Sequence, residues 1–134
     1  MFSFETNIRV RYAETDRIGY VYYGNYAQYF EVGRVESLRQ LGLNYKEMED
    51  NGIMLPVYTF NVKYYKPAYY DDLLKVKTYI KKMPLASISF EYEVFNEKEE
   101  LLSKGETVLV FINKNSNKPC AAPSGFLERI KPYF

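Results

Sequence analysis

The stretch from Arg11 to Gly42, RYAETDRIGYVYYGNYAQYFEVGRVESLRQLG, carries the residues best suited to chemistry. A lone acid, Asp16, lies in a loop that leads through GYVYYGNY into a segment with a helical pattern. The first N–H groups of a helix have no intrahelical partner and lie at the positive end of its dipole. An amide at Tyr23 or Gly24 would therefore stabilise an oxyanion on a carbonyl group, and Asp16 would act on the carbonyl carbon as general base or as nucleophile.

Asp16 and Gly24 also have plainer interpretations. An aspartate followed closely by glycine is common in turns, where its side chain bonds to the backbone. Gly24 would serve close packing as well as it would serve access of a ligand to the helix start. The two glycines and the aromatic residues around the expected helix start favour a site over a simple turn. The base and nucleophile roles of Asp16 stay open.

The 134 residues include no histidine, which narrows the chemistry further. Ser-His-Asp and Cys-His systems need an imidazole base, and most transition-metal sites use imidazole or several thiolates. No metal-ligand spacing and no glycine-rich phosphate loop is present. We therefore expect neither a metal nor a cofactor, and chemistry carried out by carboxylates, hydroxyls, lysines and backbone amides.

The charge balance and the first residues indicate where the protein works. Lysine and arginine number 18 and aspartate and glutamate 17, so no strong field points to nucleic acid or to a membrane surface as partner. The start, MFSFETNIRV, is unlike a signal peptide, and no apolar run is long enough to cross a bilayer. Cys120 is the single cysteine. A cytoplasmic location is expected.

Hydrophobic periodicity predicts the elements that position the site. Alternation over Phe2 to Tyr12 predicts a strand with one buried face. From about Tyr22 to Leu41, apolar residues recur three to five positions apart, which predicts one long helix that ends at Gly42. The segment NYKEMEDNG predicts a short helix or turn.

Alternation then predicts four more strands, at residues 58–64, 74–80, 86–94 and 101–113, before a short terminal helix with Ser124 as its cap. One strand, one long helix and four strands joined by short polar turns indicate an α+β fold, an antiparallel sheet with the helix packed on a single face. No repeat or linker interrupts the chain, so residues 1–134 are predicted to form one domain.

An ordered set of motifs extends over nearly the whole chain: DRIGYVYYGNY at 16–26, Phe30-Glu31 and Arg34, KPAYYDD at 66–72, SISFEYEV at 87–94, Lys118-Pro119 and Pro123. This set resembles the signature of the 4-hydroxybenzoyl-CoA thioesterase family. The resemblance implies the hotdog fold, with the antiparallel sheet wrapped around the helix, and hydrolysis of an acyl-CoA thioester to free acid and CoA. It also implies a homodimer with sheets joined edge to edge, active sites between the subunits, and assembly to a homotetramer.

In that family the aspartate at the position of Asp16 is the catalytic acid, and the amide at the position of Tyr23 polarises the carbonyl. We expect further substrate contacts from Gly19, Tyr20, Val21, Gly24 and Tyr26. The phosphates of CoA need cations, and the candidates are Lys66, Lys81, Lys82 and Arg129. Glu31 and Arg34, three apart on the helix, are interpreted as an ion pair.

Two departures from the family keep alternatives open. Tyr20 stands where many relatives have histidine, and Tyr23 stands where one branch has histidine, so no imidazole proton relay exists. Acyl carrier protein remains an alternative thiol carrier to CoA. A hotdog protein that binds an acyl thioester or aromatic ligand without hydrolysing it is a second alternative. Hotdog dehydratases and hydratases rely on histidine with an acid, and the absence of histidine counts against them.

Overall fold

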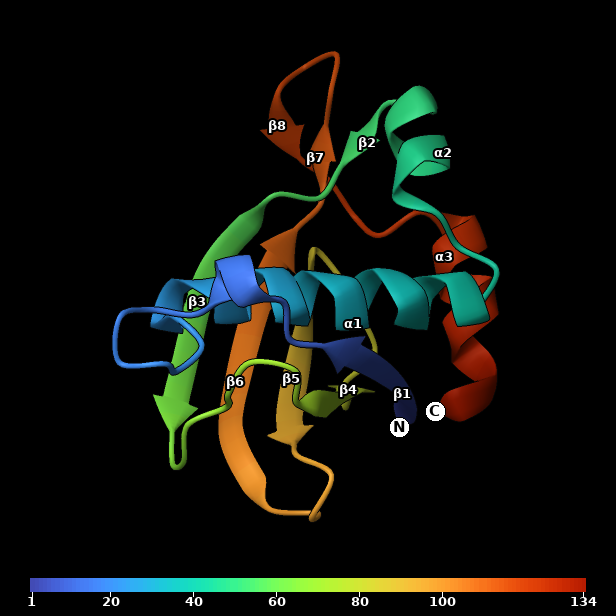
Figure 1. The fold of residues 1–134 in the computed structure, drawn as a ribbon. Helices are drawn as coiled ribbons and strands as arrows, with labels where there is room; N and C mark the ends of the chain where they lie inside the picture. The colour runs from blue at the N-terminus through green and yellow to red at the C-terminus, as the bar shows by residue number, and fades with distance from the viewer.

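The computed structural model describes residues 1–134 and contains a five-stranded antiparallel sheet with strand order β1-β4-β5-β6-β3. Helix α1 lies across one face of this sheet (Figure 1). The predicted α+β arrangement is confirmed. The bounds are β1 Phe2–Arg9, α1 Tyr26–Gln40, β3 Val57–Tyr64, β4 Leu73–Ile80, β5 Ser87–Phe95 and β6 Leu101–Val110.

Smaller elements gather at one end of the sheet. Strands β2 (Ile53–Met54), β7 (Ile112–Asn113) and β8 (Lys118–Pro119) form a second, three-stranded sheet. Helix α2 (Tyr45–Asp50) begins after Asn44, whose side-chain oxygen accepts the Glu47 N–H at 3.2 Å. Helix α3 (Ser124–Ile130) lies beside the C-terminal end of α1 (Figure 1). None of the helices combines the length and apolar character needed to cross a membrane.

The core lies between α1 and the inner face of the sheet. Strands β4 and β5 alternate strictly between half-buried and fully buried residues, as period-two patterning requires. Helix α1 adds Tyr26, Tyr29, Phe30 and Leu38, each at most 2% exposed. The ring of Phe30 stacks on Tyr92 of β5 with centroids 4.3 Å apart, which anchors the helix on the middle of the sheet.

Two element boundaries near the candidate site differ from the prediction. The first strand ends at Arg9, although the Val10 N–H still donates to the carbonyl of Asp72 in register with β4. Tyr12–Glu14 form a 3-10 turn because the next N–H, that of Arg11, binds the Glu14 carboxylate instead of a neighbouring strand. The helix expected from Tyr22 begins as a 3-10 turn at Tyr23–Asn25 and becomes α-helical only at Tyr26. Its predicted stop at Gly42 is confirmed, with φ +78°.

Two boundaries near the C-terminus also differ. The strand expected over Leu101–Asn113 breaks at Phe111, which is fully buried and packs edge-on against Phe126 of α3. Residues beyond the break pair with β2 and β8 instead of the main sheet. Ser124 is not a cap, because Pro123 takes the N-cap position and Ser124 is the first residue of α3.

Arg34 is not paired with Glu31, so that interpretation is wrong. Its side chain is turned inward, and the residue is 7% exposed. It donates to the hydroxyls of Tyr45 at 2.9 Å and Tyr92 at 3.1 Å, and its Cζ lies 6.0 Å from the centroid of the Phe90 ring. Arg34 therefore ties α1 to α2 and to β5 through neutral aromatic partners.

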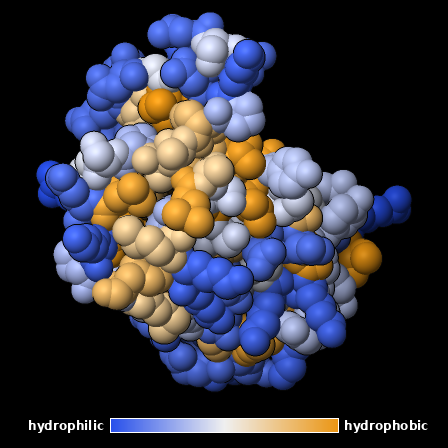
Figure 2. Space-filling model, turned by 180° about the vertical axis from the view of Figure 1, so that it is seen from behind, coloured by the Kyte–Doolittle hydropathy of each residue, from blue (hydrophilic) through white to orange (hydrophobic).

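The other face of the sheet has no helical cover. Seen from behind in Figure 2, it carries a hydrophilic area beside a hydrophobic band. Ion pairs lie across neighbouring strands there, between Lys104 and Glu93 at 3.8 Å and between Lys81 and Glu91 at 3.1 Å. Strand β3 pairs only with β6, and seven of its eight residues are exposed. Apolar and polar residues alternate along β3 as predicted, but neither face of this strand is buried in the chain.

Gly105 of β6 marks the closest approach of the sheet to Phe30, and Gly105→Ala is expected to destabilise the fold. A Cβ there would lie 2.2 Å from Cε2 of Phe30 and 3.0 Å from the carbonyl oxygen of Asn61. Overpacking of this kind costs about 1–3 kcal/mol in the free energy of unfolding. Gly125→Ala in α3 is the matched control, since nothing lies within 4 Å of its Cβ position. Denaturant unfolding measures both variants, and wild-type stability of Gly105→Ala would contradict this packing.

Candidate active site

The loop between β1 and α1 folds around the side chain of Asp16. One carboxylate oxygen, Oδ1, accepts the N–H groups of Ile18 at 3.0 Å and Tyr20 at 3.1 Å. The N–H of Asp16 itself donates to the carbonyl of Tyr20 at 2.7 Å, and Gly19 takes φ +93° to close the turn. The second carboxylate oxygen has no hydrogen-bond partner in the protein. Asp16 is therefore both a turn residue and a half-buried acid with one free oxygen.

The amides at the helix start are unpaired. Tyr23 and Gly24 are the first two residues of the 3-10 turn, and neither N–H donates to any group of the protein. Their neighbours are occupied: the Tyr22 N–H donates to the Glu14 carbonyl and the Asn25 N–H to the Tyr22 carbonyl, both at 2.9 Å. The two consecutive N–H groups of Tyr23 and Gly24 lie at the positive end of the α1 dipole and are free to donate to a ligand oxygen that carries negative charge.

Asp16 and Tyr23 line one cavity of about 340 Å³. Six of the residues predicted for the site meet there, together with three that were not predicted, namely Tyr64, Tyr65 and Pro67. The predicted residues in the lining are Asp16, Tyr20, Val21, Tyr23, Tyr26 and Lys66. One wall is therefore formed by the loop before α1 and the first residue of that helix, and the other by the end of β3 and the segment that follows it.

Three predicted residues do not line this cavity. Gly19 shapes the Asp16 turn through its positive φ. A Cβ on Gly24 would lie 2.8 Å from the ring of Tyr22, so its contact in this chain is with a neighbouring side chain. Lys82 is exposed in the connection between β4 and β5.

Tyr26 is a buried phenol that faces the cavity. It is 2% exposed, and its hydroxyl makes no hydrogen bond within the protein. Burial, with smaller contributions from Tyr64 and Asp72, raises the pKa of Tyr26 to about 12, so the hydroxyl stays protonated at neutral pH. Its ring packs edge-on against Tyr64 with centroids 5.1 Å apart. Tyr26 is therefore a neutral donor available to a ligand.

Lys66 is the one predicted cation in the lining, and its charge is already paired. Its Nζ binds the carboxylate of Glu100. The hydrogen bond from Lys66 is the main cause that lowers the pKa of Glu100, with Asn96 contributing a second hydrogen bond. An anionic ligand would therefore share Lys66 with Glu100.

Glu14 was not predicted and is the most enclosed acid near the site, at 7% exposed. Oε1 accepts the Arg11 N–H at 2.8 Å and the Tyr29 hydroxyl at 2.9 Å, and Oε2 accepts Arg11 Nε at 3.1 Å. Burial alone would raise the pKa of Glu14, but the hydrogen bonds from Arg11 and Tyr29 outweigh it and hold that pKa below its usual value. Glu14 is consequently ionised at neutral pH.

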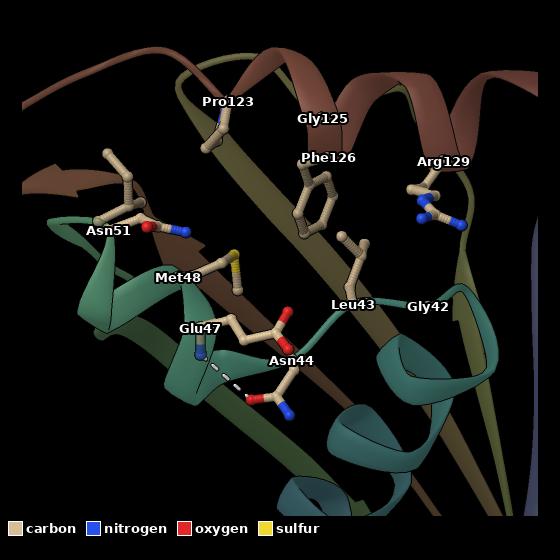
Figure 3. A pocket seen from close by; sticks show the side chains of 11 residues that line it. Gly42, Leu43, Asn44, Glu47, Met48, Asn51, Pro123, Gly125, Phe126 and Arg129 are labelled. Carbon is tan, nitrogen blue, oxygen red and sulfur yellow. Dashed lines mark hydrogen bonds between the residues drawn. The ribbon is translucent and has the colours of Figure 1, made fainter.

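A second cavity, of about 250 Å³, lies at the other end of α1 (Figure 3). Gly42, α2 and α3 enclose it, with Met48 and Phe126 among its apolar residues and Arg129 beside Gly42. Arg129 therefore belongs to this cavity, and Asp16 and Tyr23 do not line it.

The sequence matches the thioesterase-like superfamily over residues 10–130. The chain is 38% identical to YneP of Bacillus subtilis, covering 84% of this chain and 81% of YneP. It is 30% identical to the acyl-CoA thioester hydrolase YbgC of Escherichia coli, covering 96% of each. The crystal structure of a DHNA-CoA thioesterase from Staphylococcus aureus has a TM-score of 0.94 at 39% identity, covering 99% of this chain and 91% of that one.

The fold and these matches identify a hotdog-fold thioester hydrolase. The chain belongs to the thioesterase-like superfamily. The hotdog fold expected from the ordered set of motifs along the chain is confirmed together with its α+β class.

Proposed function

We propose that this protein hydrolyses acyl-CoA thioesters to a free acid and CoA, with Asp16 as general base or nucleophile and the Tyr23 amide as oxyanion donor. The observation that carries the proposal is one cavity that holds an acid with a free carboxylate oxygen and a residue with an unpaired N–H. The thioester carbonyl accepts a hydrogen bond from the Tyr23 N–H, and the dipole of α1 stabilises the charge that develops on its oxygen.

The acyl group then lies among the aromatic side chains of the cavity wall. Tyr20, Tyr26, Tyr64 and Tyr65 supply flat apolar surface, and the free hydroxyl of Tyr26 supplies one donor. Lys66 is the cation of this wall for a phosphate of CoA, in competition with Glu100. The relatives named above, an acyl-CoA thioester hydrolase and a DHNA-CoA thioesterase, support a CoA thioester as substrate.

A thiol-release assay over short, long, branched and aromatic acyl-CoAs tests this activity. Release of CoA from at least one of them, at a rate that depends on Asp16, is expected. The same acyl groups on acyl carrier protein decide between the two carriers. Binding of acyl-CoA without release of thiol over the whole panel would show a ligand-binding protein and overturn the proposal.

We also propose that two copies join along the free edge of β3 to form a homodimer, and that two dimers form a homotetramer. An unpaired edge with exposed apolar side chains invites strand pairing with a second chain. The hydrophobic band on the outer face of the sheet offers a second contact (Figure 2). Since Tyr64 and Tyr65 follow this edge into the cavity wall, the dimer places a neighbouring subunit close to the site.

Light scattering tests the assembly and is expected to give about four times the 15.9 kDa mass of the chain. Tyr58 of β3 is 74% exposed, and Tyr58→Asp is expected to weaken the dimer about tenfold or more, as loss of an interface tyrosine does. Tyr12→Asp, at a loop tyrosine 78% exposed, is the matched control. A monomeric wild-type protein would contradict the assembly.

A further inference from the structure

Glu14 holds the two halves of the candidate site together through its main chain. Its carbonyl oxygen accepts the Tyr22 N–H at 2.9 Å and the side-chain amide of Asn25 at 2.7 Å. Tyr22 and Asn25 flank Tyr23 and Gly24, which carry the unpaired donors. Asp16 follows Glu14 by two residues. One peptide group therefore links the strand side of the site to its helix side.

The side chain of Glu14 fixes the same link from a different direction. Its carboxylate accepts the hydroxyl of Tyr29, which lies in the first turn of α1 and is 2% exposed. Arg11 closes the other side with its N–H and its guanidinium. The loop that carries Asp16 is thereby bonded to the first turn of α1, just after the two residues with unpaired N–H groups. Charged hydrogen bonds of this kind hold geometry more strongly than neutral ones.

We propose that Glu14 is a positioning residue, which sets the spacing between the Asp16 carboxylate and the Tyr23 amide through its bonds to Tyr29, Tyr22 and Asn25. The inference rests on the proposed hydrolysis. Glu14 touches no substrate, since it does not line the cavity. Misplacement of reacting groups by about 1 Å lowers rates as much as a hundredfold. Loss of a hydrogen bond that keeps Asp16 and the Tyr23 amide in place is therefore expected to lower turnover strongly.

Tyr29→Phe and Glu14→Gln test the inference, because each removes part of the bond without changing the size of the side chain. We expect kcat to fall about tenfold for Tyr29→Phe and further for Glu14→Gln, with KM within about twofold. Both are assayed well below their melting temperatures with the folded fraction checked by circular dichroism. Glu106→Gln is the matched control, an exposed carboxylate without a partner on β6. Its kcat is expected to be that of the wild type.

A double-mutant cycle with Asp16→Asn separates positioning from general stabilisation. If Glu14 acts through the alignment of Asp16, Tyr29→Phe and Glu14→Gln lose almost nothing further in the Asp16→Asn background. Multiplicative losses, or a Tyr29→Phe enzyme with wild-type kcat, would overturn the positioning role while leaving the proposed hydrolysis intact. Unchanged turnover in Asp16→Asn alone, or a wild-type protein that releases no thiol, would instead overturn the proposed function and this inference with it. Tyr29→Phe decides the matter if Glu14→Gln does not fold.

Discussion

Asp16→Asn is expected to lower turnover of acyl-CoA by about a hundredfold or more, the usual contribution of a general base. Asparagine keeps a side-chain oxygen that can accept the N–H groups of Ile18 and Tyr20, so the loop is retained. The amide nitrogen replaces the free carboxylate oxygen and can neither accept a proton from water nor attack a carbonyl carbon. The loss is therefore expected in kcat, at unchanged thermal stability.

Steady-state thiol release at saturating acyl-CoA measures this loss. Asp71→Asn is the matched control: Asp71 is exposed, has no side-chain hydrogen bond, and has φ +67°, a conformation that asparagine tolerates. An Asp16→Asn enzyme with wild-type kcat would remove the acid from the mechanism. In the wild type, a burst of CoA ahead of free acid would identify Asp16 as nucleophile, since it reports an acyl-enzyme intermediate.

The fold was predictable because two periodicities dominate the sequence. Alternation in residues 74–80 and 86–94 matches β4 and β5 closely, since both strands lie in the middle of the sheet and bury one face. The spacing of apolar residues up to Gly42 likewise gave the end of α1. Where an element lies at an edge or a break, as β3 and Phe111 do, periodicity cannot show which neighbour covers it.

The part of the site whose residues lie close together in the sequence was predictable. Asp16, Tyr20, Val21, Tyr23 and Tyr26 lie within eleven residues, and their types and the two glycines suggested an acid beside a helix start. Of the wall formed by the end of β3 and the segment after it, only Lys66 was predicted, because the contact of this wall with the loop depends on sheet topology rather than on spacing.

Glu14 shows what the sequence could not reveal. The predicted strand stops at Tyr12, and a charged residue beyond that end gives no sign of burial. Its partner Tyr29 is fifteen residues away across the turn into α1, and in sequence it resembles any tyrosine of a core-facing helix. The Arg11 and Glu14 pair, three apart before a loop, is the one local signal that could have indicated a fixed turn.

Tyr23→Pro is expected to lower kcat about a hundredfold relative to Tyr23→Ala, because proline has no N–H to offer the oxyanion. The position accepts proline well. Tyr23 is the first residue of its helical turn, where a proline ring fits and where its N–H bonds to no protein group. Tyr22 has φ −59° and ψ 131°, the conformation favoured before proline. The Tyr23 carbonyl, which accepts the Tyr64 hydroxyl at 2.9 Å, is kept.

Tyr23→Ala removes the same aromatic ring and keeps the N–H, so the ratio of the two variants isolates the amide from the side chain. The loss is expected in kcat rather than KM, since the hydrogen bond strengthens as charge develops on the carbonyl oxygen. Equal turnover of the two variants would exclude the Tyr23 amide as the donor. Gly24, the other unpaired N–H at the start of α1, would then be the donor that the helix dipole supports.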